Sequence, residues 1–345
     1  MTLHCAFIGF GKSTTRYHLP YVLHRKDRWQ VAHIYRRRAK PEEQAPQYSH
    51  IHFTSDLDEV LNDPLVKLVV VCTHADSHFE YAKKALEAGK NVLVEKPFTP
   101  TLEEAKTLFA LANSKGLTVT PYQNRRFDSC FLTTKKVIES GKLGELVEIE
   151  SHFDNYRPLA ETNPGGPQNG EFYGLGVHTL DQIISLFGRP DHVSYDLRSL
   201  RNKANPDDTF EAQLFYGDMK AIVKTSHLVQ IDYPKFIVHG HKGSFVKYGI
   251  DQQETSLKAN IMPGEPGFGA DDSVGELVYV NEAGEMVREA VPLESGDYGR
   301  VYDALYDTLV NGQPNYVKET DVLTNMEILQ RGFEQPSPAT ITLIR

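Results

Sequence analysis

The first residues that could do chemistry form a glycine-rich turn, Gly9-Phe10-Gly11-Lys12-Ser13-Thr14. The turn follows an apolar run and precedes an amphipathic segment, so we expect it between a strand and a helix. Glycine at 9 would let the chain reverse, and glycine at 11 would let the backbone approach a pyrophosphate at the helix N-terminus. Thr14 stands where the pattern has glycine or alanine, so the match is incomplete. The turn predicts a dinucleotide-binding site.

The same residues allow a second interpretation, because Gly11-Lys12-Ser13 matches the end of a phosphate-binding P-loop. That loop requires a glycine five residues before Gly11, and this chain has Ala6 there, inside the expected strand. The sequence therefore argues against an ATPase.

The end of the second expected strand carries Arg36, Arg37 and Arg38 and no acid. At this place an acid binds the ribose hydroxyls of NAD, whereas a base accommodates the 2′-phosphate of NADP. Guanidinium groups are permanently charged and bind phosphate through two hydrogen bonds. We therefore predict that NADP is preferred to NAD as the cofactor and is held mainly by Arg36 and Arg37. The alternative is an exposed loop that is simply basic.

Length and composition are those of an ordinary globular chain. The 345 residues suffice for about two domains, and 46 acidic against 37 basic side chains give a formal charge of -9. This charge has the wrong sign for a nucleic-acid-binding protein. Three cysteines without a CxxC pair suggest neither disulfides nor a cysteine zinc site, and no apolar run approaches the roughly 20 residues that span a bilayer. We expect no signal peptide, no membrane contact and a cytoplasmic location.

The first 120 residues alternate short apolar runs with amphipathic segments, as strand-helix units around a parallel sheet do. We expect strands at 3–8, 29–35, 52–54, 68–73, 91–95 and 117–121, with helices at 13–23, 57–61, 77–87 and 102–113. After residue 122 the pattern changes to strands joined by short glycine-containing turns, which favours antiparallel pairing. Here we expect strands at 146–153, 192–199, 209–215, 219–227, 235–239 and 244–248, and helices at 131–140, 299–310 and 321–333.

Several short motifs accompany the glycine turn. The fifth expected strand ends in Glu95-Lys96-Pro97, after a helix that stops at Ala88-Gly89-Lys90. Further motifs are Thr73 to His78, Gln123 to Asp128, Gly176 to Asp181, Leu186 to Pro190 and His239 to Ser244. Together they resemble the Gfo/Idh/MocA family of glucose-fructose oxidoreductases and inositol dehydrogenases over nearly the whole chain. In detail the sequence is most similar to one branch of that family.

The resemblance implies an α/β protein with two domains. Residues 1–121 would form a Rossmann dinucleotide-binding domain. Residues 122–345 would form an α+β domain with a large, mostly antiparallel sheet that binds substrate and mediates dimerisation. The implied activity is NAD(P)-dependent hydride transfer to or from a sugar, a polyol or a related hydroxy or carbonyl compound.

Lys96 is the expected acid/base residue. Oxidation of an alcohol requires a base that removes the hydroxyl proton while the cofactor takes the hydride. Lys96 ends a parallel strand, where the ligands of such sheets bind, and burial or a neighbouring cation lowers the pKa of a lysine. The family assigns its lysine this role, and Lys96 is the matching position.

The family's second catalytic element is an Asp-x-x-x-His-x-x-Asp stretch on the first helix of the C-terminal domain. The matching residues here run from Gly174 to Asp181, with His178 and Asp181 present and Gly174 in place of the first aspartate. The resemblance implies that His178 transfers a proton or orients the substrate. The missing carboxylate often assists the lysine or binds a substrate hydroxyl, so Gly174 leaves the substrate class, and even activity, open.

The remaining motif residues are assigned by the resemblance. The cofactor would contact the glycine turn and also Thr73, His74, His78, Glu95, Lys96 and Asn124. In the cleft between the domains, the substrate would contact Lys96, Arg125, Arg126, His178 and Asp181. Asp154 and Tyr156 are further substrate candidates at a strand end, or alternatively part of a polar sheet edge. His74 and His78 have the spacing of a helical zinc pair, but His74 precedes the expected helix, so we expect no metal.

The second domain's sheet has apolar side chains that need cover: Phe210, Leu214, Ile222, Val223, Phe236 and Val238. Family members commonly pair these sheets face to face, so the resemblance implies a homodimer, with the chain's own helices as the alternative cover. A different class of function also remains open, a dinucleotide-binding sensor or regulator without turnover. The family includes a non-catalytic repressor, and Thr14 and Gly174 depart from the family patterns.

Overall fold

The computed structural model describes residues 1–159 and 164–343, which form two compact units. Unit 1 consists of Met1–Asn124, Ala259–Phe268 and Tyr298–Met326, and unit 2 of the remainder, beginning at Arg125. The two later segments of unit 1 return to the N-terminal residues, which no motif in the sequence signals. The functional boundary after residue 121 stays a prediction.

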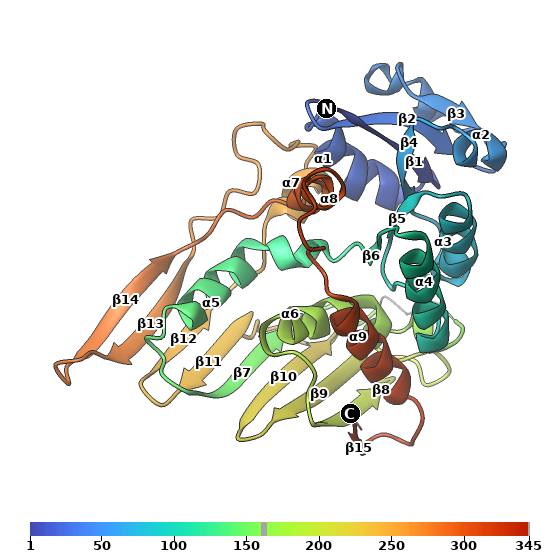
Figure 1. Cartoon of the computed structure of the whole chain (residues 1–345). Helices are drawn as coiled ribbons and strands as arrows, with labels where there is room; N and C mark the ends of the chain where they lie inside the picture. Colours follow the sequence, from blue (N-terminus) through green and yellow to red (C-terminus); the bar gives the residue numbers. More distant parts are fainter. Residues whose placement is uncertain (160–163, 344–345) are drawn as a thin grey trace. The chain divides into compact units, whose positions relative to one another are not determined.

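Unit 1 contains a parallel sheet of six strands in the order β3-β2-β1-β4-β5-β6 (Figure 1). Helices cover the sheet, and the Leu and Val side chains of residues 68–71 are completely buried because a parallel sheet faces helices on both sides. The strands are β1 (Leu3–Ile8), β2 (Trp29–Tyr35), β3 (His52–Thr54), β4 (Val66–Val71), β5 (Asn91–Val94) and β6 (Val119–Pro121).

Local sequence fixes the ends of the helices in unit 1. Thr101 and Glu104 form a reciprocal capping box at the start of α4, and Gly116 ends that helix in the left-handed conformation. The helix expected at 13–23 is instead a π-helical turn, Ser13–His18, followed by α1; Pro20 supplies no backbone N–H at the junction. The helices are α1 (Leu19–Leu23), α2 (Leu57–Leu61), α3 (His78–Glu87), α4 (Leu102–Lys115) and α8 (Arg300–Asn311).

Unit 2 contains a mixed sheet of nine strands in the order β14-β13-β12-β11-β7-β10-β9-β8-β15. Every neighbouring pair is antiparallel except β7 with β10, which is parallel, so the expected fold class is confirmed. The strands are β7 (Leu146–His152), β8 (His192–Arg198), β9 (Thr209–Tyr216), β10 (Met219–Ser226), β11 (Phe236–Gly240), β12 (Gly243–Lys247), β13 (Val274–Val280), β14 (Met286–Pro292) and β15 (Ala339–Thr342).

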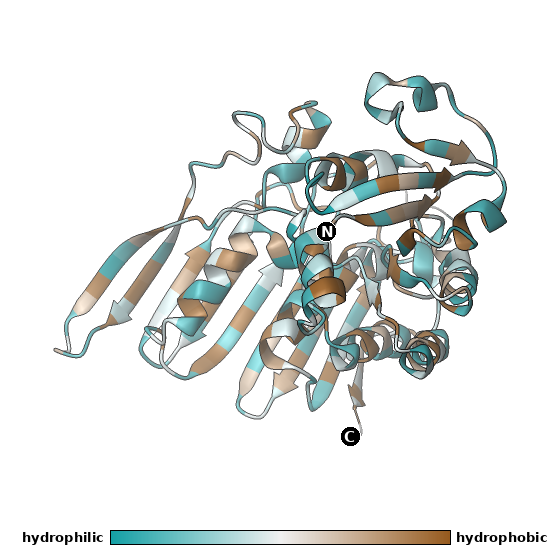
Figure 2. Ribbon diagram, turned by 45° about the horizontal axis from the view of Figure 1, so that its top comes forward, coloured by the Kyte–Doolittle hydropathy of each residue, from teal (hydrophilic) through white to brown (hydrophobic). Residues whose placement is uncertain are grey.

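Helices α5 (Ser129–Glu139) and α6 (Val177–Phe187) lie over one face of this sheet (Figure 1). The strands alternate apolar and polar residues, visible as brown and teal bands in Figure 2, because only one face is covered by helices. The other helices are α7 (Gln253–Lys258) and α9 (Glu319–Arg331).

The expected dimer residues require a correction. Phe210, Leu214, Val223, Phe236 and Val238 are 0–1% exposed, so they belong to the core of unit 2 and not to an open face. The alternation along β10 puts Ile222 on the opposite face, where it is only partly buried. These five core side chains are therefore covered by the chain's own helices, which is the alternative to cover by a second copy.

Within the described residues, no helix has the length and apolar character needed to cross a bilayer. The three cysteines are buried free thiols. No group of three or more metal-ligating side chains is found in the same part of the chain.

Candidate active site

A cavity of about 730 Å³ lies in unit 1 at the carboxyl ends of β1, β2 and β4. Ligands of open parallel sheets bind at this edge. The cavity is lined by the predicted cofactor residues Gly9, Phe10, Gly11, Lys12, Ser13, Arg36, Arg37, Thr73 and His74, and also by Tyr35, Arg38, Lys40, Cys72, Asp76, Ser77 and Tyr81. The glycine turn, the basic run and the strand-end motif thus meet around one space.

Gly9 and Gly11 have different physical roles in the turn. Gly9 has a φ of +112°, and a Cβ there would lie 2.5 Å from the carbonyl oxygen of Cys72. Only glycine fits this position. A Cβ at Gly11 would meet nothing within 4 Å, which leaves the backbone open to a ligand. Thr14 is completely buried, and its hydroxyl donates to the carbonyl of Gly9 at 2.8 Å, which closes the turn.

Arg36 binds a carboxylate of the chain itself. Its Nε and Nη2 atoms donate to the two oxygens of Glu43 at 2.8 and 3.0 Å. The hydrogen bond to Arg36 holds the pKa of Glu43 below its usual value, although burial opposes this. Glu43 also accepts from the backbone N–H of Lys40 at 2.8 Å. Arg36 is therefore a brace for the loop after β2.

Lys40 crosses to the glycine turn. Its Nζ donates to the carbonyl of Phe10 at 2.6 Å. The Phe10 ring packs edge-on against Tyr48 and Phe53. The loop after β2 is thus fixed against the glycine turn, with the exposed Arg37 on the wall of the cavity.

The motif after β4 forms one wall and a brace behind it. Thr73 and His74 line the cavity, and the Ser77 hydroxyl donates to the carbonyl of His74 at 2.9 Å. His78 is buried, with its ring nitrogens 2.8 Å from the carbonyl of Pro97 and 3.1 Å from that of Thr73. Burial lowers the pKa of His78, so the neutral ring donates to one carbonyl at a time. This histidine joins the ends of β4 and β5.

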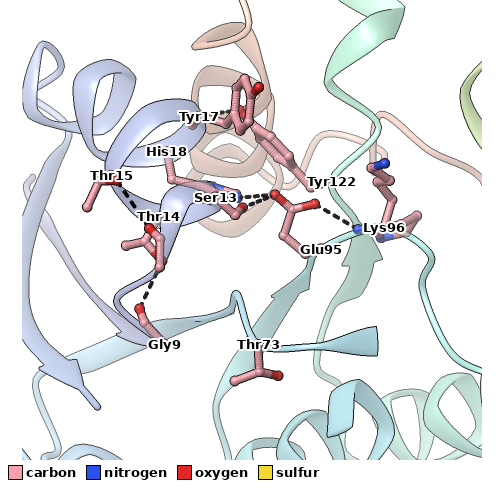
Figure 3. Close-up of polar contacts among 12 residues, drawn as sticks. Gly9, Ser13, Thr14, Thr15, Tyr17, His18, Thr73, Glu95, Lys96 and Tyr122 are labelled. Atoms are coloured by element: carbon pink, nitrogen blue, oxygen red, sulfur yellow. Dashed lines mark hydrogen bonds and ion pairs between the residues drawn. The ribbon is translucent and has the colours of Figure 1, made fainter. Parts of the chain in front are cut away.

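A buried carboxylate, Glu95, lies behind the glycine turn (Figure 3). Ser13 donates to its Oε1, and Nε2 of His18 lies 3.2 Å from the same oxygen. The backbone N–H of Lys96 donates to Oε2 at 2.9 Å. Nδ1 of His18 in turn contacts the hydroxyl of Tyr302, from α8, at 2.7 Å. One carboxylate therefore connects the helix after the turn to the end of β5.

Ionisation of Glu95 is set by two opposing effects. Burial disfavours the charged form, but the contacts with His18 and Ser13 and the charge of Lys96 outweigh it and lower the pKa from 4.5 to about 2. The Lys96 side chain turns away from this carboxylate in Figure 3. Lys96 itself is half-buried, and Asn124 is buried at the end of unit 1.

The predicted substrate residues of unit 2 include two arginines that are paired with acids. Arg126 forms two 2.8 Å hydrogen bonds with Asp181, which is 2% exposed. Arg125 binds Glu254 at 3.0 Å and stacks over the ring of Phe153. These pairs orient the arginines and fill part of their hydrogen-bonding capacity.

His178 is the second residue of α6 and is 5% exposed. Gly174 precedes it by one turn, within the π-helical turn Phe172–Gly176. Elsewhere in unit 2, Asp154 accepts from the backbone N–H of Ser226 at 2.7 Å, while Tyr156 is 52% exposed. The substrate roles of these residues stay predictions.

The comparisons with known proteins agree with this architecture. Residues 3–123 match the model for the oxidoreductase family NAD-binding Rossmann fold, and residues 135–342 match the model for its C-terminal alpha/beta domain. The chain belongs to the Gfo/Idh/MocA oxidoreductase family.

Relatives of this family match the whole length of the chain. It is 83% identical to the uncharacterized oxidoreductase YhhX of Escherichia coli over all 345 residues of both chains. A crystal structure of an oxidoreductase from Bacillus cereus is 50% identical, covers 99% of each chain and superposes with a TM-score of 0.97. The scyllo-inositol 2-dehydrogenase (NADP(+)) IolW of Bacillus subtilis is 32% identical over 96% of this chain and 93% of its own.

The residues around the cavity fit the dinucleotide that this oxidoreductase family binds. The open space beside Gly11 is where a pyrophosphate would lie, and Lys12, Arg37 and Arg38 supply positive charge along the wall. Thr14, His78, Glu95, Lys96 and Asn124 do not line this cavity; the first three brace its walls. Lys40 and Tyr81 on the wall are not among the predicted cofactor residues, although Lys40 follows the arginine run by two positions.

We predict that Gly9→Ala and Gly11→Ala affect different properties. Gly9→Ala should lower the thermal unfolding midpoint, because the new Cβ meets the Cys72 carbonyl and the backbone strain alone costs about 1–3 kcal/mol. Gly11→Ala should leave the midpoint nearly unchanged and weaken dinucleotide binding at least about tenfold, because the methyl group enters the open space. Circular dichroism and fluorescence titration measure the two effects. Equal destabilisation by both variants would contradict the geometry.

We predict that the stabilisation supplied by Glu95 depends on pH. Its pKa is lowered on folding, so this stability is present above pH 4.5 and is lost as the pH falls toward about 2. The unfolding midpoint of the unmodified chain should exceed that of Glu95→Gln most above pH 4.5, and the difference should shrink in more acidic buffers. Glu103→Gln, at an exposed site on α4, is the control. A difference that is constant across pH would contradict the assigned role.

Proposed function

We propose that this protein is an NADP-dependent oxidoreductase acting on a CH–OH or carbonyl group of a sugar, a polyol or a related compound. One observation carries the proposal: the dinucleotide cavity has Arg37, Arg38 and Lys40 at the end of β2, where discrimination between NAD and NADP is made. The family membership supports the reaction class, and the relative IolW, a scyllo-inositol 2-dehydrogenase (NADP(+)), supports both the cofactor and a polyol substrate.

The four basic residues on the cavity wall after β2 are assigned different roles. Arg36 is held in two hydrogen bonds by Glu43, so we assign the main contact with the 2′-phosphate to Arg37. Arg38 and Lys40 add positive charge on the same wall. Glu43 is bound by Arg36 and is therefore less able to accept from ribose hydroxyls, as an acid does in NAD sites.

In the proposed reaction, the cofactor transfers the hydride and a protein side chain transfers the proton. The nicotinamide dinucleotide, when bound, accepts or supplies the hydride. Lys96 removes the proton from the substrate hydroxyl during oxidation and returns it to the carbonyl oxygen during reduction. His178 hydrogen-bonds the same oxygen and orients it. Glu95 accepts a hydrogen bond from the backbone N–H of Lys96, which fixes the position of the lysine backbone.

We also propose the supporting substrate residues, the cellular location and the oligomeric state. Residues 122–345 would bind the substrate, with Arg125, Arg126, Asp154, Tyr156 and Asp181 as supporting residues, in a cytoplasmic protein. A homodimer would use the sheet face opposite α5 and α6. There the strand register aligns Ile222, Glu150, Ile237 and Val246 in one row.

We predict that purified protein oxidises or reduces some member of a panel of sugars, polyols and their keto forms with NADP(H), and that Lys96→Ala lowers this turnover at least about 100-fold. Loss of a general acid/base residue lowers rates by about 10²–10⁴-fold. Lys83→Ala, an exposed lysine on α3, is the matched control and should be fully active. Absorbance at 340 nm follows the reaction.

Two other outcomes would contradict parts of this proposal. Turnover that persists in Lys96→Ala would remove the acid/base assignment. Tight binding of NADP(H) with no turnover on any panel member would favour a dinucleotide-binding sensor or regulator over an enzyme.

We predict that Arg37→Ala lowers the ratio of kcat/KM for NADP to that for NAD by about 10- to 100-fold, because it removes a charge-assisted hydrogen bond worth about 1.5–3 kcal/mol. Arg126→Ala should leave this cofactor ratio unchanged, because Arg126 binds Asp181 in unit 2. A chain that uses NAD as well as NADP before any substitution would contradict the cofactor assignment.

A further inference from the structure

The turn that leads into α6 begins with a glutamate whose carboxylate covers a glycine. An ideal Cβ at Gly174 would lie 3.1 Å from Oε2 of Glu171 and 3.8 Å from its Cδ. At Gly176 the corresponding Cβ would instead meet the rings of Phe172 and Phe210, at 2.9 and 3.2 Å. Gly174 therefore lies on the polar side of this turn, and Gly176 on the side that faces the core.

The polar side continues along the helix. His178 and Asp181 are three residues apart in α6 and share one helical face, and Gly174 lies four residues before His178 in the π-helical turn that leads into this helix. The Glu171 side chain is 21% exposed, His178 is 5% exposed and Asp181 is 2% exposed. The carboxylate of Glu171 thus lies over position 174, four residues before His178, and is more exposed than His178 and Asp181.

Contacts at both ends fix the position of Glu171. Its backbone N–H donates to the carbonyl of Asp207 at 2.9 Å, and the N–H of Phe172 donates to the Asp207 side chain at 2.7 Å. Its Oε1 lies 3.5 Å from Nε2 of His227. Burial and nearby arginines lower the pKa of His227 to about 4, so this imidazole is neutral near pH 7.

We propose that Glu171 supplies the carboxylate of the substrate site beside His178, in place of the aspartate that the chain lacks at position 174. The inference rests on the proposed oxidoreductase function and goes one step further, because it assigns a substrate contact to a residue outside the motif. Glu171 accepts a hydrogen bond from a hydroxyl of the substrate and orients it. No bond to Glu171 forms or breaks, and the hydride and proton move as described above.

The test removes the carboxylate at position 171 and introduces one at position 174. Glu171→Ala should lower kcat/KM for the substrate by about 10- to 100-fold, the value of one charge-assisted hydrogen bond. Adding Gly174→Asp to Glu171→Ala should restore activity to within about tenfold of the unmodified chain, because the shortened residue 171 vacates the space beside 174. Adding Gly174→Asn instead is the matched control, with the same size and no charge, and should not restore activity. Gly174→Asp alone places two carboxylates together and should lower activity.

Two further measurements separate a substrate contact from a structural role. NADPH affinity should be the same in all these variants, and the unfolding midpoint should not follow activity across the series. Glu171→Gln keeps the side-chain shape, so its loss of activity at an unchanged midpoint excludes misfolding as the cause. Full activity of Glu171→Ala, or no rescue by Gly174→Asp, overturns the inference while leaving the oxidoreductase proposal intact. Absence of turnover by the unmodified chain overturns both.

Discussion

The arrangement of the dinucleotide site depends on one buried carboxylate. Glu95 is removed from water, a costly placement for a charge, and its partners Ser13, His18 and the backbone of Lys96 compensate that cost. Removing any partner would leave a buried charge less well satisfied. The glycine turn and the strand end that carries Lys96 are therefore held in register by the same interaction that stabilises the fold.

The constraint extends to a segment that is distant in the sequence. His18 contacts the Tyr302 hydroxyl, and the indole N–H of Trp29 donates to the carbonyl of Tyr302 at 3.0 Å. Arg25 binds Asp303 of the same helix through two hydrogen bonds. Helix α8 thus completes the packing of unit 1 behind the cofactor cavity, and the site is supported on a side that no nucleotide-binding motif describes.

Much of unit 1 could be predicted from the sequence because its strands are continuous apolar runs bounded by turn residues. The expected limits of β1, β2 and β3 agree with the structure residue for residue. The hairpin of β13 and β14 is not among the expected strands, although a turn at Gly284 joins them. Residues 277–280 form a continuous apolar run and do not alternate with polar residues, so the period of a half-buried strand is not visible there.

The parts of the site that could not be predicted depend on contacts between separate segments. The sequence predicts Arg36 and Arg37 together as phosphate ligands, but only the fold shows that Arg36, although it lines the cavity beside Arg37, is bound by Glu43. Likewise, the sequence alone indicates that a carboxylate is missing at Gly174. In the structure, the carboxylate of Glu171 lies over that position. Side-chain pairing of this kind has no period or motif, so sequence patterns do not report it.

A crystal structure of the full chain grown with NADP and a polyol would show which residues hold the cofactor. We expect the 2′-phosphate on Arg37, the pyrophosphate beside Gly11 and the nicotinamide ring within reach of the Lys96 ammonium. A dinucleotide whose 2′-phosphate points away from Arg37, or whose nicotinamide ring lies out of reach of Lys96, would contradict the proposed function.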